Sequence, residues 1–283
     1  MLRSLKYKSK VVGNKTKEIK GENMKHIAVI TGASSGMGRE FVRQLDGKFD
    51  EIWGIALEKD GLEKVKEEIK TPFKPLALDL TVGESFTTYL NLLQSEEIVV
   101  DWLVNASGFG KFGRYDEIDV NTSANMVDLN CKATLKMTEL TLPYMQKGGR
   151  IVNIASVAGF QPIPYIATYG ATKAFVISYS RALNQELKPR GIKITTVCPF
   201  WTKTAFFDRA LKTKAKNEVV SKYVVMYDPK KVVATAIKHT IKGKEMSIYG
   251  FIARSQVRLV HLLPKKAVMN IWIKQQKLNK KYK

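Results

Sequence analysis

Short apolar runs alternate with longer amphipathic stretches between residue 24 and about residue 250 of this 283-residue chain. The apolar runs have the length of strands, and the stretches between them repeat their apolar positions at helical spacing. The predicted strands are 26–30, 52–56, 74–78, 102–105, 150–155, 193–198 and 245–249, and the predicted helices are 37–47, 60–70, 83–94, 121–146, 167–188 and 228–242. Mostly uncharged strands that alternate with helices are typical of a parallel sheet covered on both faces. We therefore predict one doubly wound α/β domain with about seven strands.

Two segments at the start and middle of the chain depart from this alternation. Residues 1–23 are rich in Lys and have no apolar period, so we expect a disordered basic lead, with Met24 as a second candidate for the natural start. Residues 200–227 follow a strand without a clean period, and we expect a substrate loop or lid there. The α/β domain is accordingly assigned to 24–250 and a basic and apolar extension to 251–283.

The extension mixes apolar residues with Lys and Arg and allows two interpretations. It either packs on the domain as a helix with a solvated basic tail, or lies on an anionic membrane surface as an amphipathic segment. Pro264 interrupts the segment, which favours packing on the domain.

The composition narrows the class of protein. Apolar residues make up 45% of the chain, which is typical of a folded domain rather than a disordered one. The net charge of +21 favours contact with anionic ligands or surfaces but names no partner. Two cysteines, Cys131 and Cys198, form no disulfide framework, and no secretory signal or run of eighteen apolar residues is present. We expect a cytoplasmic protein without a metal site.

A glycine-rich turn follows the first predicted strand. Residues 31–38 read T-G-A-S-S-G-M-G and lead directly into a predicted helix. Backbone N–H groups and the helix dipole at such a turn can bind a pyrophosphate, although the spacing G-x-x-x-G-x-G differs from the generic G-x-G-x-x-G pattern. The predicted contacts are Gly32, Ser34, Ser35, Gly36, Met37 and Gly38. The alternative is a tight turn without a ligand.

A second group of residues points to proton transfer. Ser156 follows a predicted strand, and Tyr169 and Lys173 lie four residues apart on a predicted helix, where they share one face. Lowering a tyrosine pKa from about 10 to ~7 requires about 4 kcal/mol of preferential stabilisation of the phenolate. The Lys173 cation and an oxidised nicotinamide would supply it together, while Ser156 would hold the substrate oxygen.

These motifs, in this order and spacing, resemble those of the short-chain dehydrogenase/reductase family over residues 24 to about 250. The resemblance implies a Rossmann-like domain, an NAD(P) cofactor and hydride transfer between a nicotinamide and a ketone or secondary alcohol. It also implies that Asp79 contacts the adenine, that Asn105 closes the cofactor site, and that Thr204 lies beside the nicotinamide. Asn130 corresponds to a fourth catalytic residue that holds a water linking Lys173 to solvent.

The chain departs from the family pattern at several positions. Ala106 and Ser107 replace an Asn and an Ala after Asn105, and Phe200 replaces a Gly after Pro199. Ala56 and Leu57 stand where family members often carry the Asp or Arg that selects NAD or NADP. Glu58 favours NAD by its spacing from the glycine turn, whereas the small Ala56 and nearby Lys59 leave room for a 2′-phosphate. We lean slightly toward NADP(H).

Aromatic and apolar residues flank the expected site. Those assigned to the substrate pocket are Ser156, Phe160, Phe200 and Trp201, with Pro162, Ile163, Pro164, Phe206 and Phe207 nearby. A pocket of this kind suits a lipophilic ketone, such as a steroid-like or acyl compound. Packing of these aromatics onto the domain is an equally good reading. A 3-oxoacyl thioester reductase and a non-catalytic dinucleotide sensor are the competing functions.

The expected partners follow from the same resemblance. They are a small carbonyl or alcohol substrate and further copies of the chain, paired through helices 121–146 and 167–188 into a dimer or tetramer. No nucleic acid partner is expected, and peripheral membrane contact through 251–283 is the less favoured alternative.

Overall fold

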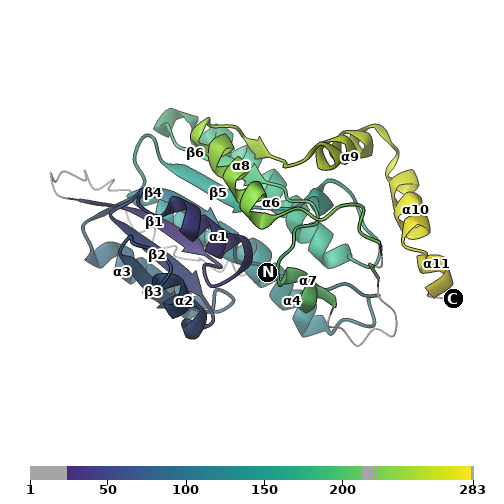
Figure 1. Ribbon diagram of the computed structural model, residues 1–283, viewed down its shortest axis with the longest axis horizontal. Helices are drawn as coiled ribbons and strands as arrows, with labels where there is room; N and C mark the ends of the chain where they lie inside the picture. The colour runs from purple at the N-terminus through teal and green to yellow at the C-terminus, as the bar shows by residue number, and fades with distance from the viewer. Residues whose placement is uncertain (1–23, 212–218, 221, 282–283) are drawn as a thin grey trace, which may run out of the picture.

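The computed structural model describes residues 24–211, 219–220 and 222–281, and its centre is a parallel sheet of seven strands (Figure 1). The strands are β1 (Lys25–Thr31), β2 (Glu51–Ala56), β3 (Phe73–Ala77), β4 (Ile98–Asn105), β5 (Arg150–Ile154), β6 (Lys193–Val197) and β7 (Met246–Ser247). Their spatial order is β3-β2-β1-β4-β5-β6-β7, and every pair is parallel. This arrangement confirms the predicted doubly wound α/β fold. The order reverses between β1 and β4, and ligands bind such sheets at the carboxyl ends of the strands beside this point.

Each central strand contributes side chains to two separate cores. In β1, Ile27 and Val29 pack into the core on one face, whereas Ala28 and Ile30 pack into the core on the other. Alternate residues of a strand point to opposite faces, so a strand covered on both sides must be apolar at consecutive positions. This requirement explains the uninterrupted apolar runs in the sequence.

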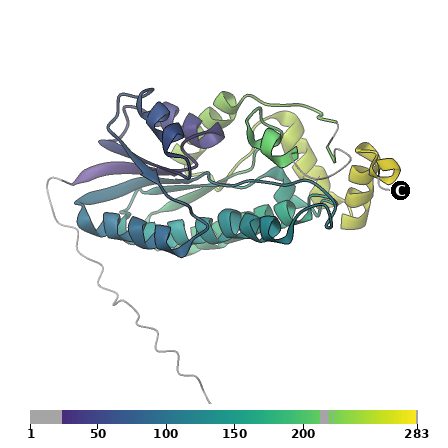
Figure 2. The same ribbon diagram turned by 90° about the horizontal axis from the view of Figure 1, so that it is seen from below.

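Two layers of helices cover the sheet, as Figure 2 shows. One face carries α1 (Gly36–Leu45), α2 (Lys59–Lys66) and α8 (Pro229–Ile241). The other carries α3 (Gly83–Ser95), α4 (Val120–Val127), α5 (Ala133–Thr141) and α6 (Ala167–Glu186). Short helical turns are η1 (Asp128–Lys132), η2 (Leu142–Tyr144), η3 (Val157–Phe160), η4 (Lys188–Arg190) and α7 (Phe206–Leu211).

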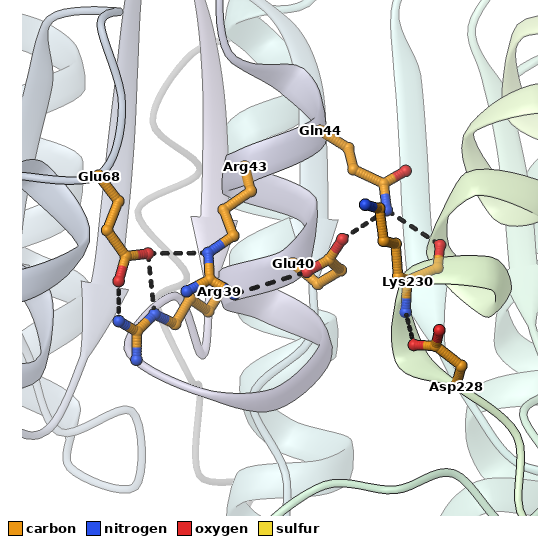
Figure 3. A network of polar contacts seen from close by, with 7 residues as sticks. All are labelled: Arg39, Glu40, Arg43, Gln44, Glu68, Asp228 and Lys230. Atoms are coloured by element: carbon orange, nitrogen blue, oxygen red, sulfur yellow. Dashed lines mark hydrogen bonds and ion pairs between the residues drawn. The ribbon is translucent and has the colours of Figure 1, made fainter.

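Polar contacts join the helices of the first layer to one another (Figure 3). Glu68, just after α2, accepts hydrogen bonds from Arg39 Nε at 3.1 Å and from Arg43 Nε at 2.8 Å, both on α1. Gln44 of α1 donates to the Lys230 carbonyl of α8 at 3.0 Å. Hydrogen bonds to Glu68 on one side and to α8 on the other therefore hold α1, which begins at the glycine-rich turn, in place between them.

The predicted helix 121–146 is wrong as a single element. It divides into α4, the π-helical turn η1, α5 and the 3-10 turn η2. The π turn widens the helix at Asp128–Lys132, and Pro143 cannot donate a backbone N–H, so the α-helical pattern ends near it. The apolar periodicity of the sequence does not reveal the extra residue of a π turn when the helical stretches on both sides keep their apolar positions.

The segment after β7 forms three helices, α9 (Phe251–Leu262), α10 (Lys265–Gln275) and α11 (Leu278–Lys281). They form an arm beside the body of the molecule in Figure 1. Trp272 Nε1 donates to the Pro164 carbonyl at 3.0 Å, and buried Gln276 exchanges two hydrogen bonds of 3.1 Å with the backbone of Lys222. These bonds attach α10 and the residue that follows it to two loops of the body.

Some expectations concern residues outside the described part of the chain. The basic lead 1–23 lies there entirely, and the expected loop 200–227 lies there in part, at 212–218 and 221. In the described part of that loop, α7 is helical. Among the described residues, no helix is both long and apolar enough to span a membrane.

Candidate active site

A cavity of about 1100 Å³ opens at the carboxyl ends of the central strands. One end is lined by the glycine-rich turn after β1, the middle by residues that follow β4 and β5, and the far end by α9 and α10. The lining of the cavity therefore runs from the glycine-rich turn to the C-terminal helices.

The glycine-rich turn has the shape of an anion cradle. Gly32 and Gly36 adopt positive φ angles of 67° and 54°, where side chains are strained. A Cβ atom on Gly38 would lie 2.2 Å from the Gly32 carbonyl oxygen, so the strand and the helix can approach this closely only with glycine there. The first turn of α1 has no acidic residue and its N-cap, Ser35, makes no side-chain cap. Free N–H groups of a helix start suit a pyrophosphate.

The predicted cradle contacts mostly reach the cavity. Gly32, Ser34, Ser35, Gly36 and Met37 line it, and Gly38 lies behind them. Asp79 also lines the cavity, on the side of Ala56, Leu57 and Glu58, and its Oδ1 accepts hydrogen bonds from the Thr81 amide and hydroxyl at 2.9 and 2.6 Å. These bonds hold the Asp79 carboxylate in one orientation at the end where an adenine would lie.

Asn105, which the family resemblance predicts to close the cofactor site, does not itself line the cavity. Its Nδ2 donates to Thr138 Oγ1 at 3.0 Å and to Asn153 Oδ1 at 2.8 Å, which joins the ends of β4 and β5 to α5. Because side chains alternate along β4, that of Asn105 points to the face of the sheet covered by α5 and not toward the glycine-rich turn. Thr31 Oγ1 instead joins β1 to β4, because it accepts from the Ala106 and Ser107 amides at 3.0 Å each.

Ser156, Tyr169 and Lys173 meet in the middle of the cavity wall. Ser156 follows β5 and caps η3 by accepting from the Ala158 amide at 3.1 Å. Lys173 Nζ donates to the Ile154 carbonyl at 2.9 Å and lies 5.7 Å from the centre of the Tyr169 ring. The i, i+4 spacing on α6 places both side chains on one face, as the sequence predicts.

Burial dominates the proton affinities of these groups. It raises the pKa of Tyr169 to about 12, against a smaller opposing effect of a hydrogen bond from Ser156. Burial lowers the pKa of Lys173 to about 8. Near pH 7 the Tyr169 phenol is therefore protonated in the chain alone, and Lys173 is largely a cation. The further lowering of the Tyr169 pKa by Lys173 together with an oxidised nicotinamide stays a prediction.

Asn130 lies in the π turn η1, behind the cavity wall. Its amide exchanges hydrogen bonds with the Phe109 backbone at 3.0 and 2.9 Å and donates to Thr172 Oγ1 at 3.0 Å. A Cβ atom on Gly108 would lie 2.8 Å from Asn130 Oδ1 and 3.5 Å from Lys173 Nζ. Asn130 and Lys173 therefore face a common point beside Gly108, and π turns are frequent at functional sites.

The comparison with known families settles the class of protein. Residues 26–215 match the short chain dehydrogenase family. The chain belongs to this family. It is accordingly an oxidoreductase of the class that acts on carbonyl and CH–OH groups.

Relatives of this short-chain dehydrogenase include proteins of different lengths. An uncharacterized oxidoreductase of Staphylococcus epidermidis is 32% identical over 198 residues, which cover 68% of this chain and 86% of the relative. The very-long-chain 3-oxoacyl-CoA reductase of Mus musculus is 28% identical and covers 95% of this chain and 88% of its own length. A short-chain dehydrogenase from Sphingobium yanoikuyae, solved in complex with NADPH, superposes with a TM-score of 0.69 at 26% identity, covering 81% of this chain and 91% of that one.

The substrate end of the dehydrogenase cavity differs from the prediction at one aromatic residue. Phe200, Trp201 and Thr204 line the cavity, but Phe160 does not. The Phe160 ring packs instead against His261 of α9, with ring centres 5.5 Å apart. Because η3 turns the chain directly after Ser156, Phe160 points away from the cavity and toward the C-terminal arm.

Residues that the sequence did not suggest complete the far wall. The cavity there is lined by residues of α9, of α10 and of the turn between them, all beyond the segment that matches the family: Phe251, Ile252, Leu259, Val260, Leu263, Val268, Ile271 and Trp272. Gln161 also lines the cavity, and its buried Oε1 has no hydrogen-bond partner among the described residues. The helical spacing of the apolar residues in 251–283 predicts helices with an apolar face, but it does not predict that this face lines the cavity.

Proposed function

We propose that this chain is an NAD(P)(H)-dependent oxidoreductase that interconverts a lipophilic ketone and its secondary alcohol, with Tyr169 as the general acid or base. One observation carries the proposal. Ser156, Tyr169 and Lys173 lie between an anion cradle at one end of a cavity and an apolar wall at the other. A dinucleotide against the cradle and a carbonyl compound against the wall would meet at the Tyr169 hydroxyl.

The chain's own residues can manage the proton. A bound reduced nicotinamide dinucleotide supplies the hydride. Ser156 donates a hydrogen bond to the carbonyl oxygen, and Tyr169, which is protonated near pH 7, donates its proton to the same oxygen. Lys173, held by the Ile154 carbonyl, stabilises the phenolate that remains. Asn130 faces the same point beside Gly108 as Lys173 and would hold a water there, through which Tyr169 regains a proton from solvent by way of Lys173.

The adenosine end supports a slight preference for NADP(H). Ala56 is small, and Leu57 is largely exposed beside Glu58 at the cavity edge. Lys59 begins α2 directly after them and is exposed, so it is close enough in the chain to reach a 2′-phosphate. The Sphingobium yanoikuyae relative was solved with NADPH.

The apolar far wall supports a lipophilic substrate, and a 3-oxoacyl thioester is the second candidate. The relative from Mus musculus is a very-long-chain 3-oxoacyl-CoA reductase. An acyl chain would lie along α9 and α10, whose cavity residues are mainly aliphatic. Lys111 lines the same cavity and would favour a thioester that carries phosphates.

We further expect a homodimer or homotetramer formed through the helical stretches 121–146 and 167–188, which contain α4, α5 and α6. Val127 on α4 and Phe175 on α6 are exposed apolar side chains, and α4 and α6 are in contact with each other. Burial raises the pKa of Cys131 to about 11 and of Cys198 to about 12, so both thiols stay protonated near neutral pH. Two buried free thiols are compatible with the reducing cytoplasm that we expect for this chain.

The test compares the wild type with Tyr169→Phe and with the control Tyr144→Phe, which removes a phenol that does not line the cavity. NADH and NADPH binding is measured by fluorescence titration, and turnover is measured on lipophilic ketones and on 3-oxoacyl thioesters. We expect all three proteins to bind the cofactor with similar affinity and turnover to fall at least about 100-fold in Tyr169→Phe alone. Normal turnover by Tyr169→Phe, or failure of the wild type to bind either cofactor, contradicts the proposal. Binding without turnover on any substrate would favour the non-catalytic sensor.

A further inference from the structure

Helix α9 carries a stripe of exposed apolar side chains. Leu262 is 81% exposed, Phe251 is 74% exposed and Leu259 is 53% exposed. They occupy positions 251, 259 and 262, and Ser255 lies between them, so the intervals of four, four and three residues place them on one face. The opposite face of α9 holds the buried residues Ala253, Val257 and Val260. Exposed large apolar side chains grouped in this way mark an interaction surface.

Cations border this stripe. Arg254 and Arg258 are exposed, and Arg258 lies one helical turn from both Arg254 and Leu262. Neither arginine forms an ion pair with an acidic side chain among the described residues. Residues 251–283 contain no Asp or Glu, and their cations are Arg254, Arg258, Lys265, Lys266, Lys274, Lys277, Lys280, Lys281 and Lys283. An anionic surface is the complement of this arm.

The stripe is continuous with the wall of the cavity. Phe251 and Leu259 belong both to the exposed stripe and to the residues that line the cavity, and Ile271 of α10, also exposed, lines it from the next helix. The arm lies at the end of the molecule beyond the carboxyl ends of the strands (Figures 1 and 2). An apolar compound at the stripe would therefore be at the mouth of the cavity.

We propose that α9, with the start of α10, docks the protein on the surface of an anionic phospholipid membrane and opens the cavity mouth toward the lipid. Leu262, Phe251 and Leu259 enter the acyl boundary, and Arg254, Arg258, Lys265 and Lys266 contact phosphate groups. The contact is peripheral, because α9 has 12 residues and cannot cross a bilayer. α9 ends at Leu262 and α10 starts after Pro264, so the chain turns between the two helices and α9 can lie in the membrane plane on its exposed face.

A second copy of the chain fits this surface less well. Two identical arms would bring like charges together around the apolar stripe, with no acidic residue in either arm to offset them. A lipid surface of opposite charge satisfies both the apolar and the cationic residues. The docking does not depend on the substrate or on the proposed reaction.

Co-sedimentation with vesicles tests the docking on the full chain. Vesicles of phosphatidylcholine alone are compared with vesicles that also contain phosphatidylglycerol, at low and high salt. We expect binding to the phosphatidylglycerol vesicles that weakens as salt rises. Leu262→Ser should weaken this binding about tenfold, since one leucine side chain then stays out of the lipid. Arg258→Gln should weaken it about fivefold.

Matched controls separate docking from general attraction of the +21 chain to anions. Ile241→Ser removes an exposed apolar side chain on α8, and Lys238→Gln removes a cation on the same helix; neither should change binding. All four positions are exposed, so the variants should melt at the wild-type temperature. Absence of binding to phosphatidylglycerol vesicles overturns the proposal. So does binding that the arm variants and the control variants change equally, which would assign it to diffuse charge.

Light scattering tests the alternative that a second copy of the chain, rather than a membrane, covers the stripe. If the Leu262→Ser protein has a smaller mass in solution than the wild type, and the wild type ignores vesicles, the stripe is an interface between copies and the proposal is wrong. Unchanged mass together with weaker vesicle binding supports the membrane. Cofactor binding and ketone turnover in detergent-free buffer should be unchanged in Leu262→Ser, so failure of the docking and failure of the proposed reaction give different results.

Discussion

The Lys173 ammonium donates a hydrogen bond of 2.9 Å to the carbonyl oxygen of Ile154, the last residue of β5. Ser156 follows two residues later, so this one bond ties the catalytic face of α6 to the strand end that carries the serine. Lys173 is thereby held at the cavity wall by the backbone. The fold therefore also affects the protonation of Lys173, because burial at this position lowers the pKa of its ammonium group to about 8.

We predict an alkaline limb in the pH profile of ketone reduction. Lys173 loses its proton as the pH rises through about 8, whereas Tyr169 keeps its proton until about pH 12. The value of kcat/KM should therefore fall about tenfold per pH unit above about pH 8. In Lys173→Arg, whose guanidinium stays charged, the remaining activity should not show this limb. An alkaline limb at the same pH in both proteins would assign the titration to another group.

Gly108→Ala should reduce both turnover and stability. The new Cβ atom would lie 2.8 Å from Asn130 Oδ1 and would push Asn130 away from the point beside Gly108 that both Asn130 and Lys173 face. We expect kcat to fall about tenfold or more, with a loss of about 1 to 3 kcal/mol in the free energy of unfolding. Gly83→Ala is the control, because a Cβ atom there meets nothing within 4 Å. Equal kinetics for both variants would show that the Asn130 position does not matter for turnover.

Trp272→Phe should weaken substrate binding without affecting the cofactor. Trp272 lines the far wall, and its Nε1 bond to the Pro164 carbonyl attaches α10 to the loop before α6. Loss of one such bond costs about 1 kcal/mol, so KM for a lipophilic ketone should rise about fivefold while the dissociation constant of NAD(P)H stays constant. Trp102→Phe, on β4 away from the cavity, should change neither value. A KM unchanged by Trp272→Phe would mean that substrate does not reach α10.

Glu68→Gln should destabilise the fold in a pH-dependent way. Hydrogen bonds from Arg39 and Arg43 lower the pKa of Glu68 from 4.5 to about 2. A lowered carboxyl pKa stabilises the fold above the ordinary pKa, and this contribution is lost as the pH falls from about 4.5 toward 2.

Because the Glu68 side chain is partly exposed to water, we expect a loss of only about 1 kcal/mol at pH 7. Urea unfolding at pH 7 and pH 4 measures it, and the difference from wild type should be smaller at pH 4. Glu67→Gln, its exposed neighbour, is the control and should be neutral at both values. A Glu68→Gln deficit that is the same at both pH values would show that the carboxylate charge is not its source.

Much of this dehydrogenase can be predicted from local pattern. A strand buried on both faces must be apolar throughout, and the turn after β1 must be glycine-rich to approach a helix so closely; both constraints act on neighbouring residues and are visible in the sequence. The i, i+4 spacing that places Tyr169 and Lys173 on one face of α6 is local in the same sense. For this reason the sheet, the cradle and the catalytic face of α6 could all be predicted.

Other features depend on residues far apart in the chain. The sequence by itself determined the parallel sheet and the chemistry at its edge, since these follow from periodicity and from short motifs. Only the tertiary structure decided that Phe160 faces His261, that Asn105 lies beneath the sheet, and that α9 forms the cavity wall. Periodicity shows that a helix has an apolar face, but which surface covers that face is set by packing between distant segments, where a small change in the direction of a turn selects a different neighbour.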